Sequence, residues 1–294
     1  MNPFRKLYDK LPAQIRVAIR SLTPNAFKRW YAHQKTDVYL VSYPKCGRTW
    51  LRLMIGKAIT QTYSLTENER TLFLDWSEKI HPEAPYIKVI HEDRPMLKSP
   101  DELQTSKARY KQKKIILLVR DPRDVIVSSY FEMKKRAKIF GKNPYEKRSA
   151  SFEGTISEFI NQKHGGFDTI IRYYNIWAKN RHVPKGLLLV RYEDMHANPQ
   201  KELRRVIGFL GLSAISDEVL EQAVAFASFD NMRNMEKNGS FSSGMLNPVN
   251  LSDKESFKTR KGKIGGYYDY LDDEEIARLN QKMSALSNFF GYIC

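Results

Sequence analysis

The chain has 294 residues, of which 41% are hydrophobic, so it can form one large α/β domain or two small ones. Its formal net charge of +16 predicts negatively charged partners: nucleic acid, a membrane surface, or phosphorylated and sulfated small molecules. The two cysteines, Cys46 and Cys294, argue against a disulfide framework and against a zinc site. No apolar run approaches the roughly 20 residues of a membrane span, and residues 1–20 lack the apolar centre of a signal peptide. A cytoplasmic protein is therefore expected.

The first 36 residues are strongly basic, with eight Lys or Arg residues against a single acid, Asp9. Pro12 suits the first turn of a helix, and residues 15–22 would place an apolar stripe along one face of it. Such a segment could lie on an anionic membrane, or it could pack on the rest of the protein with a solvated basic face. The sequence predicts a basic helical segment over residues 1–36 and a single α/β domain over residues 37–294.

Short apolar runs alternate with helical patterns from residue 37 onward. The predicted strands are Val38–Val41, Tyr86–Ile90, Ile115–Val119 and Leu187–Val190. The predicted helices are Thr49–Thr60, Arg123–Lys138, Ile156–Arg181, Pro199–Leu210 and Asp217–Phe226. This alternation predicts an α/β fold with a central, mostly parallel sheet flanked by helices. Gly141–Gly154 and Asn231–Glu255 are predicted as long loops, which either cover a binding site or simply lie at the surface.

Ligands of parallel sheets bind outside the carboxyl ends of the strands. The residues that follow the four predicted strands are therefore candidates for a site. They are Lys45, His91, Arg120 and Tyr192.

The segment YPKCGRTWLR, residues 43–52, joins the first predicted strand to the first predicted helix. Gly47 permits a close approach of the backbone, and the free N–H groups at the start of the helix favour an anion. The loop is P-loop-like, although Lys45 precedes the glycine, unlike the lysine of ATPase loops. Cys46 and Arg52 also have the spacing of the thiol phosphatases, in which a cysteine thiolate is the nucleophile. The segment predicts an anion site under either interpretation.

Two further motifs contain phosphate-binding residue types. Arg120 ends the third predicted strand, Asp121-Pro122 reads as a helix cap and first turn, and Ser128 falls about two turns into that helix. Arg120 and Ser128 could hold a phosphate, or Arg120 could pair with Asp121 or Asp124. Residues 260–266, RKGKIGG, place two cations before a glycine-rich turn, which suits a phosphate clamp or a basic surface loop.

Taken together, these motifs resemble those of the cytosolic-type sulfotransferases, which use 3′-phosphoadenosine 5′-phosphosulfate (PAPS). The matching features are YPKCGRTW, Arg120 with a serine eight residues later, Tyr192-Glu193-Asp194-Met195, and the late RKGKIG segment. They occur in the family's order over residues 37–267. The resemblance implies transfer of a sulfonate group from PAPS to a hydroxyl group of an acceptor, with release of 3′,5′-adenosine bisphosphate (PAP).

The resemblance also implies roles for individual residues. The donor-binding set is Lys45, Cys46, Gly47, Arg48, Thr49, Trp50, Arg120, Ser128, Tyr192, Phe229, Arg260, Lys261 and Gly262. The loop would hold the phosphosulfate, and the aromatic residues would contact the adenine. Arg120, Ser128 and the late motif would bind the 3′-phosphate. His91 would be the base for a direct in-line transfer, with Lys45 stabilising the leaving phosphate, so that no metal is required.

The chain departs from the family pattern at three points. The lysine that usually lies two residues before the histidine is Lys88, which is one position off and would point to the other face of the strand. Cys46 and Arg48 replace the usual loop serine and a usual threonine. The family's C-terminal dimer motif is not recognisable after Gly266, so the oligomeric state stays open.

Two other classes of protein remain alternatives. A thiol phosphatase predicts that Cys46→Ser abolishes activity, whereas a sulfotransferase predicts that this change is tolerated. A nucleic-acid-binding protein is prompted by the basic charge, but no recognised nucleic-acid motif is present, so no specific nucleic acid is expected. The sequence does not identify the acceptor, for which a carbohydrate, a lipid, a small alcohol or a phenol all remain open.

Overall fold

The computed structural model describes residues 25–76, 78–136, 152–212, 214–242, 246–247 and 250–292. Its contacts divide the chain into two units, Met1–Thr36 and Asp37–Cys294. In the first unit, helix α3 spans Asn25–Lys35. The Phe27 ring of α3 contacts the rings of Trp30 and Tyr31, three and four residues later on the same helical face. The predicted helix beginning at Pro12 lies outside the described residues.

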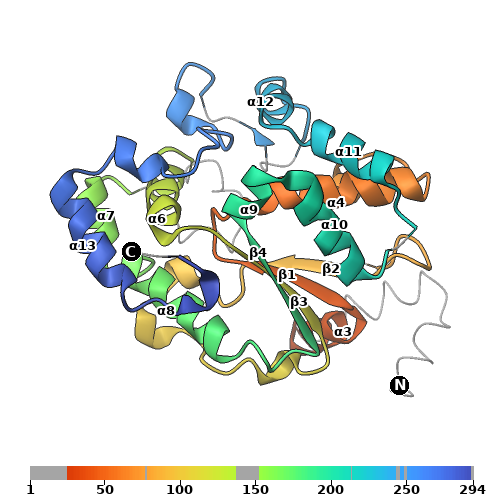
Figure 1. Ribbon diagram of the computed structural model, residues 1–294, viewed down its shortest axis with the longest axis horizontal. Helices are drawn as coiled ribbons and strands as arrows, with labels where there is room; N and C mark the ends of the chain where they lie inside the picture. The colour runs from red at the N-terminus through yellow and green to blue at the C-terminus, as the bar shows by residue number, and fades with distance from the viewer. Residues whose placement is uncertain are drawn as a thin grey trace. The chain divides into compact units, whose positions relative to one another are not determined.

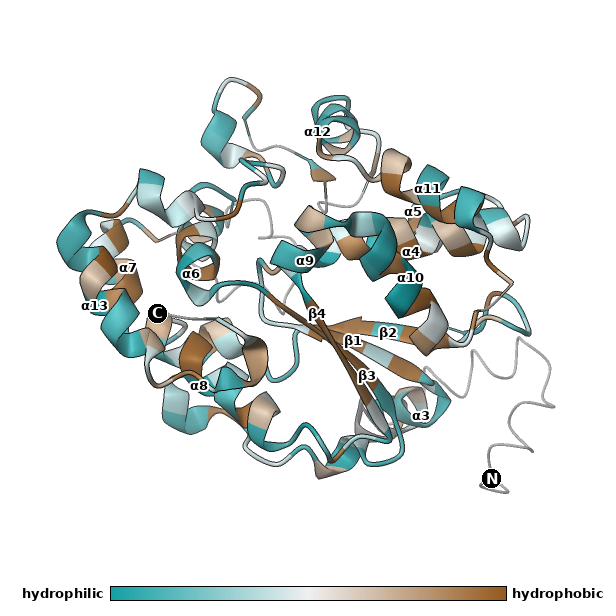
Figure 2. Cartoon of the chain, viewed as in Figure 1, coloured by the Kyte–Doolittle hydropathy of each residue, from teal (hydrophilic) through white to brown (hydrophobic). Residues whose placement is uncertain are grey.

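The described strands of the second unit form one parallel sheet in the order β2-β1-β3-β4 (Figure 1). The strands are β1 (Val38–Ser42), β2 (Ile87–Ile90), β3 (Lys114–Val119) and β4 (Gly186–Arg191). Every residue of β1 is buried, and Figure 2 shows the strands as mostly apolar. The central strands β1 and β3 are buried and read as continuous apolar runs, whereas the edge strands β2 and β4 are mostly half-buried. The sequence predicted all four to within one residue at each end.

Helices cover the sheet on both sides. Figure 1 shows α4, α10 and α11 on one side, and α6, α8 and α13 on the other. The α-helices of this unit are α4 (Arg48–Thr62), α5 (Glu69–Leu72), α6 (Pro122–Phe131), α7 (Ile156–Asn161), α8 (Phe167–Lys179), α9 (Tyr192–Ala197), α10 (Pro199–Leu210), α11 (Asp217–Phe226), α12 (Phe229–Lys237) and α13 (Asp273–Met283). The flanked parallel sheet and the predicted helices α4, α10 and α11 are confirmed.

Short 3₁₀ turns connect several of these elements. They span Pro95–Leu97, Pro100–Glu102, Ala108–Tyr110, Lys254–Ser256, Gly266–Asp269 and Asn288–Phe290.

The prediction of one helix over Ile156–Arg181 is wrong, because the chain forms two helices there, α7 and α8. At the break, Gly165 adopts a φ of 72°, and its N–H donates a hydrogen bond to the carbonyl of Lys98 at 2.9 Å. A Cβ at Gly165 would lie 2.4 Å from the carbonyl oxygen of Met96. The close approach of a neighbouring segment therefore interrupts a continuous helical pattern.

The predicted helix Arg123–Lys138 is α-helical only as far as Phe131. It continues as a π-helical turn over Glu132–Arg136, and residues 137 and 138 lie outside the described residues. The fully buried Arg136 donates hydrogen bonds to the carbonyls of Asn247 and Ser256. Single π turns are rare and are often found at functional sites.

The predicted loop Asn231–Glu255 is wrong at its start, because residues 231–237 belong to α12. The Ser228 hydroxyl caps this helix by accepting the N–H of Asn231, and Met232 and Glu236, four residues apart, are buried. The rest of that segment contributes the 3₁₀ turn at Lys254–Ser256 among its described residues. Most of the other predicted loop, residues 141–151, lies outside the described residues.

Candidate active site

A cavity of about 470 Å³ opens at the carboxyl ends of the strands. Its walls come from the β1–α4 loop, the ends of β2, β3 and β4, α6, α12 and residues 258–266. The predicted site residues that line it are Lys45, Gly47, Arg48, Thr49, Trp50, His91, Arg120, Ser128, Tyr192, Phe229, Arg260, Lys261 and Gly262. The remaining predicted residue, Cys46, does not line the cavity. The sheet topology thus brings together side chains from segments more than 200 residues apart in the sequence.

The β1–α4 loop turns through two left-handed residues. Lys45 has a φ of 71° and Gly47 a φ of 87°. A positive φ is uncommon for a residue with a Cβ, so Lys45 is held in a strained conformation of the kind found at ligand-binding sites. Gly47 precedes Arg48, the first residue of α4, and gives the helix no side-chain cap. The first N–H groups of α4 are therefore available to an anion in the cavity.

Two glycines each make room for an aromatic ring of the cavity wall. A Cβ at Gly47 would lie 2.5 Å from Tyr192 Cδ2, and a Cβ at Gly262 would lie 2.5 Å from Phe229 Cδ2. The Tyr192 ring also meets Trp50 edge-on, with centroids 5.8 Å apart. Aromatic surfaces of this kind suit a flat, apolar ring such as a nucleobase.

Each predicted cation at the other end of the cavity is paired with its own carboxylate. Arg120 Nη2 lies 3.3 Å from Asp124 Oδ2, Arg260 Nη1 3.0 Å from Glu255, and Lys261 Nζ 2.6 Å from Asp269. The sequence left open whether Arg120 pairs with a neighbouring aspartate or faces a ligand. Arg120 pairs with Asp124 and also lines the cavity, so this pairing does not remove it from the wall of the site.

The wall beside Arg120 is fixed by hydrogen bonds to a single carboxylate. Asp124 accepts the backbone N–H groups of Gly265 and Tyr267 at 3.0 and 3.1 Å. The Arg120 guanidinium donates to the carbonyl of Lys263 at 2.9 Å and lies over the Tyr192 ring at 4.2 Å. The late RKGKIGG motif is thereby anchored against the start of α6.

His91 lies at the end of β2 beside Ser42, the last residue of β1. Its Nδ1 is 3.0 Å from the carbonyl oxygen of Ser42, so Nδ1–H donates this bond and Nε2 keeps its lone pair. Burial, together with the charges of Arg48, Lys258 and Lys45, holds the pKa of His91 well below its usual value of 6.5. The imidazole is therefore neutral at physiological pH and can accept a proton at Nε2.

Glu132 and Lys258 also line the cavity, and the sequence analysis missed both. Lys45 Nζ lies 2.6 Å from Glu132 Oε2, an ion pair that is largely buried. Burial opposes ionisation of Glu132, but Lys45, Lys258 and Arg136 together lower its pKa to about 2. Glu132 follows Ser128 by four residues, so its helical spacing with a predicted site residue could have indicated it.

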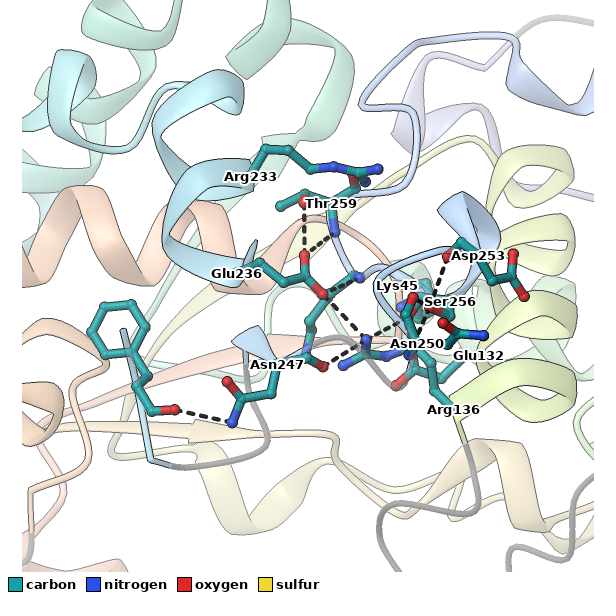
Figure 3. Close-up of polar contacts among 12 residues, drawn as sticks. Lys45, Glu132, Arg136, Arg233, Glu236, Asn247, Asn250, Asp253, Ser256 and Thr259 are labelled. Atoms are coloured by element: carbon teal, nitrogen blue, oxygen red, sulfur yellow. Dashed lines mark hydrogen bonds and ion pairs between the residues drawn. The ribbon is translucent and has the colours of Figure 1, made fainter. Parts of the chain in front are cut away.

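Glu132 belongs to a polar network behind the cavity. Figure 3 shows Glu132 beside Arg136, with Glu236 and Thr259 further along the network. Arg136 Nη1 lies 3.2 Å from Glu236, and Glu236 accepts the backbone N–H groups of Lys258 and Thr259. These bonds tie the π turn to α12 and to the segment that leads into Arg260.

The geometry does not support a thiol phosphatase. Cys46 is fully buried, its Sγ lies 3.3 Å from the Tyr174 hydroxyl, and burial raises its pKa to about 12. Arg52 lies within α4 and donates to the carbonyl of Phe73 at 2.5 Å rather than lining the cavity. The Cys46–Arg52 spacing therefore brings neither side chain to the anion site.

Among the residues that the structure describes, no group of three or more His, Cys, Asp and Glu side chains could hold a metal ion. None of the described helices has the length and hydropathy needed to cross a membrane.

Comparison with known proteins identifies the family. Residues 35–287 match the model of the sulfotransferase domain family. Cytosolic sulfotransferase 12 of Arabidopsis thaliana is 28% identical over 274 residues, covering 85% of this chain and 78% of that protein. Flavonol 3-sulfotransferase of Flaveria bidentis is 28% identical over 278 residues, covering 89% and 84%.

Solved structures show the same fold. The crystal structure of mouse sulfotransferase SULT7A1 complexed with PAP has a TM-score of 0.56, 17% identity and 91% coverage of both chains. Retinol dehydratase in complex with androsterone and inactive cofactor PAP has a TM-score of 0.54 and 19% identity, covering 85% of this chain and 80% of that one. The chain belongs to the sulfotransferase domain family and is a sulfonate-transferring enzyme. The alternatives of a phosphatase and of a nucleic-acid-binding protein are not supported.

Proposed function

We propose that the protein transfers the sulfonate group of PAPS to a hydroxyl group of its acceptor in the cavity described above. The observation that carries this proposal is the convergence of an uncapped helix start, a neutral histidine and a set of cations on one cavity of about 470 Å³. Two solved structures of the same fold are complexes with PAP, which supports PAPS as the donor.

The residues present fit such a donor. The N–H groups at the start of α4, with Lys45, Arg48 and Thr49, would hold the 5′-phosphosulfate. Trp50, Tyr192 and Phe229 would contact the adenine, and Arg120, Ser128, Arg260, Lys261 and Gly262 the 3′-phosphate. Gly47 and Gly262 support this assignment, because a Cβ at either position would collide with one of the aromatic rings.

His91 would act as the base of the reaction. The acceptor hydroxyl loses its proton to Nε2 while its oxygen forms a bond to sulfur, and the bond between sulfur and the phosphate oxygen of the donor breaks. The hydrogen bond from Nδ1–H to Ser42 holds the tautomer that this step requires. Lys45 would stabilise the negative charge that develops on the leaving phosphate oxygen.

The acceptor is proposed as a hydroxyl-bearing carbohydrate, lipid, small alcohol or phenol. A hydroxyl acceptor is supported by the relatives named flavonol sulfotransferases. It is also supported by the retinol dehydratase structures in complex with androsterone and with retinol. The buried, neutral His91 supports the same class, because a hydroxyl needs a partner that takes its proton.

The test is calorimetric titration of the purified protein with PAP, with 5′-AMP as the control ligand and no added metal. We expect binding of PAP that depends on its 3′-phosphate and that weakens by about 2–3 kcal/mol in Arg120→Ala, which loses a charged hydrogen bond. The matched control is Arg205→Ala, because Arg205 pairs with Glu202 on α10 away from the cavity. Equal affinity for PAP and 5′-AMP in folded protein would overturn the donor assignment.

We also propose a division of the chain into a basic helical segment, residues 1–36, and a single sulfotransferase domain, residues 37–294. The names of the cytosolic relatives support a cytoplasmic location. The basic segment would bring the domain to an anionic membrane surface. Co-flotation with vesicles containing 30% phosphatidylserine, but not with neutral vesicles, is the expected result; no binding, or binding that persists without residues 1–36, would contradict it.

A further inference from the structure

We propose that Lys258 is the cation that holds the sulfonate group as it passes from donor to acceptor. This inference rests on the proposed function and assigns a further residue to the same site. It starts from an unpaired charge: among the described carboxylates, none lies within ion-pair distance of the Lys258 ammonium, although Lys258 lines the cavity.

The backbone of Lys258 is fixed even though its ammonium is not. Its N–H donates to Glu236 Oε1 at 2.6 Å, and the next residue, Thr259, donates both its N–H and its hydroxyl to Glu236 Oε2. Glu236 is itself fully buried and paired with Arg136. The backbone of Lys258 is thus held firmly, while its ammonium has no carboxylate partner among the described residues. This arrangement suits the binding of an anionic ligand.

Lys258 shares the cavity wall with Lys45, Glu132 and His91, the residues proposed to act at the transfer centre. Burial lowers the pKa of Lys258 to about 7, Glu132 opposes this shift, and Lys45, Arg136 and Arg48 add to it. Lys45 is already bound to Glu132. Lys258 lines the same cavity as that pair, and a pKa of about 7 leaves it partly protonated near neutral pH. The negative charge on the sulfonate oxygens would favour its protonated form.

His91 lines the same cavity as Lys258. The charge of Lys258 is also among the causes that lower the pKa of His91. The sulfonate must pass between the leaving phosphate oxygen and the acceptor oxygen whose proton His91 takes. A cation that shares one cavity with Lys45 and His91 would therefore face the group in transit.

Another lysine near the histidine, Lys88, does not occupy this position. It lies on β2 three residues before His91 and does not line the cavity. Side chains alternate between the two faces of a strand, so Lys88 and Val89 lie on opposite faces of β2. Lys258 reaches the site instead from the segment before Arg260.

The experiment compares PAPS with PAP, because PAP lacks the sulfonate. Lys258→Met removes the charge while keeping the length of the side chain, and Lys258→Arg keeps the charge. We expect Lys258→Met to weaken PAPS binding by about 10- to 100-fold, to leave PAP binding within about twofold, and to lower kcat by about 10²-fold. Lys258→Arg should recover most of both losses.

Two control variants make the result specific. Lys254→Met removes an exposed lysine four residues earlier, and Lys88→Met removes the lysine on β2; neither should alter the ratio of PAPS to PAP affinity. Equal weakening of PAPS and PAP in Lys258→Met would show a structural role and overturn the inference. Loss of PAPS preference in Lys88→Met alone would assign the role to Lys88. Failure of the wild-type protein to bind PAP would instead overturn the donor assignment itself.

Discussion

The cations that line the cavity fall into two groups, which differ in whether each cation has its own carboxylate partner. At the end that would hold the 3′-phosphate, Arg120, Arg260 and Lys261 each have a carboxylate partner within 3.3 Å. In the group next to His91, Lys45 pairs with Glu132, and Lys258 helps to lower the pKa of that carboxylate, whereas Arg48 has no carboxylate partner among the described residues. Paired cations are held in position, whereas a surplus of cations creates a site that is incomplete without an anion.

The pKa values follow the same division. Burial lowers the pKa of Lys258 to about 7, and burial and Arg52 lower that of Arg48, next to the imidazole of His91. At the paired end, the pKa of Arg120 is raised, since Asp124 and neighbouring groups outweigh its burial. We propose that the paired cations serve for recognition of the donor and that the cations near His91 carry the chemistry.

Removal of the base should give the largest effect. His91→Ala is expected to lower turnover by roughly 10²–10⁴-fold while PAP binding stays within about twofold, because the proposed role of His91 is to take the acceptor proton. Single-turnover assays and PAP titration measure the two quantities, and His182→Ala, an exposed histidine, is the control. Normal turnover in His91→Ala would show that another group takes the proton.

The wild-type pH profile tests the same residue. Because the pKa of His91 lies well below 6.5, Nε2 remains unprotonated as the pH falls from 8 to 6.5. Loss of activity through protonation of the base is therefore expected only below this range, once the pH passes the lowered pKa. A limb near pH 6.5 that disappears in His91→Ala would contradict the buried, neutral state.

The next effect concerns the aromatic wall between the two ends. Gly47→Ala should weaken PAP binding by at least about tenfold and destabilise the fold by about 1–2 kcal/mol, because Gly47 is left-handed and its Cβ would meet Tyr192. Calorimetry and thermal unfolding measure both losses. The control is Gly208→Ala inside α10, where the added Cβ would have no neighbouring heavy atom within 4 Å. This change should be neutral or stabilising. Tight PAP binding in Gly47→Ala would mean that the Tyr192 ring does not need the space left by the absence of a Cβ at Gly47.

Much of this cavity could be predicted from the sequence. All four strands are short, mostly apolar runs, whether buried like β1 and β3 or half-buried like β2 and β4, so the residues that follow them could be predicted by position alone. Lys45, His91, Arg120 and Tyr192 all line one cavity. These predictions succeed because the carboxyl ends of parallel strands meet at one edge of the sheet.

The residues that escaped prediction depend on long-range packing. Glu132 reaches the cavity from the end of α6, and the buried Arg136 secures the π turn that follows through bonds to segments more than 100 residues later. Lys258 gains its role from Glu236 on α12, a stretch that the sequence suggested to be a loop. No local pattern could reveal that a lysine in a polar segment would be buried without a carboxylate partner among the described residues.

A smaller effect is expected at the paired end. Asp269→Asn removes the carboxylate partner of Lys261 and Lys263, so the 3′-phosphate no longer competes with it. PAP affinity should rise by about two- to fivefold, and the gain should shrink at high salt, because this pair is partly exposed. Titration at two salt concentrations measures it. A large loss of affinity would mean that Asp269 positions the lysines rather than competing for them.

The smallest effect is expected at the cysteine of the β1–α4 loop. Cys46→Ser should leave turnover within about twofold, because Sγ is buried against the Tyr174 hydroxyl and does not line the cavity. A serine hydroxyl can keep that contact, since Tyr174 donates to the carbonyl of Arg120 and can accept a hydrogen bond in turn. Steady-state assays of the variant beside His91→Ala measure the contrast. Loss of turnover equal to that of His91→Ala, with PAP binding intact, would move the chemistry to the thiol, whereas retained turnover leaves the loop with an anion-binding role.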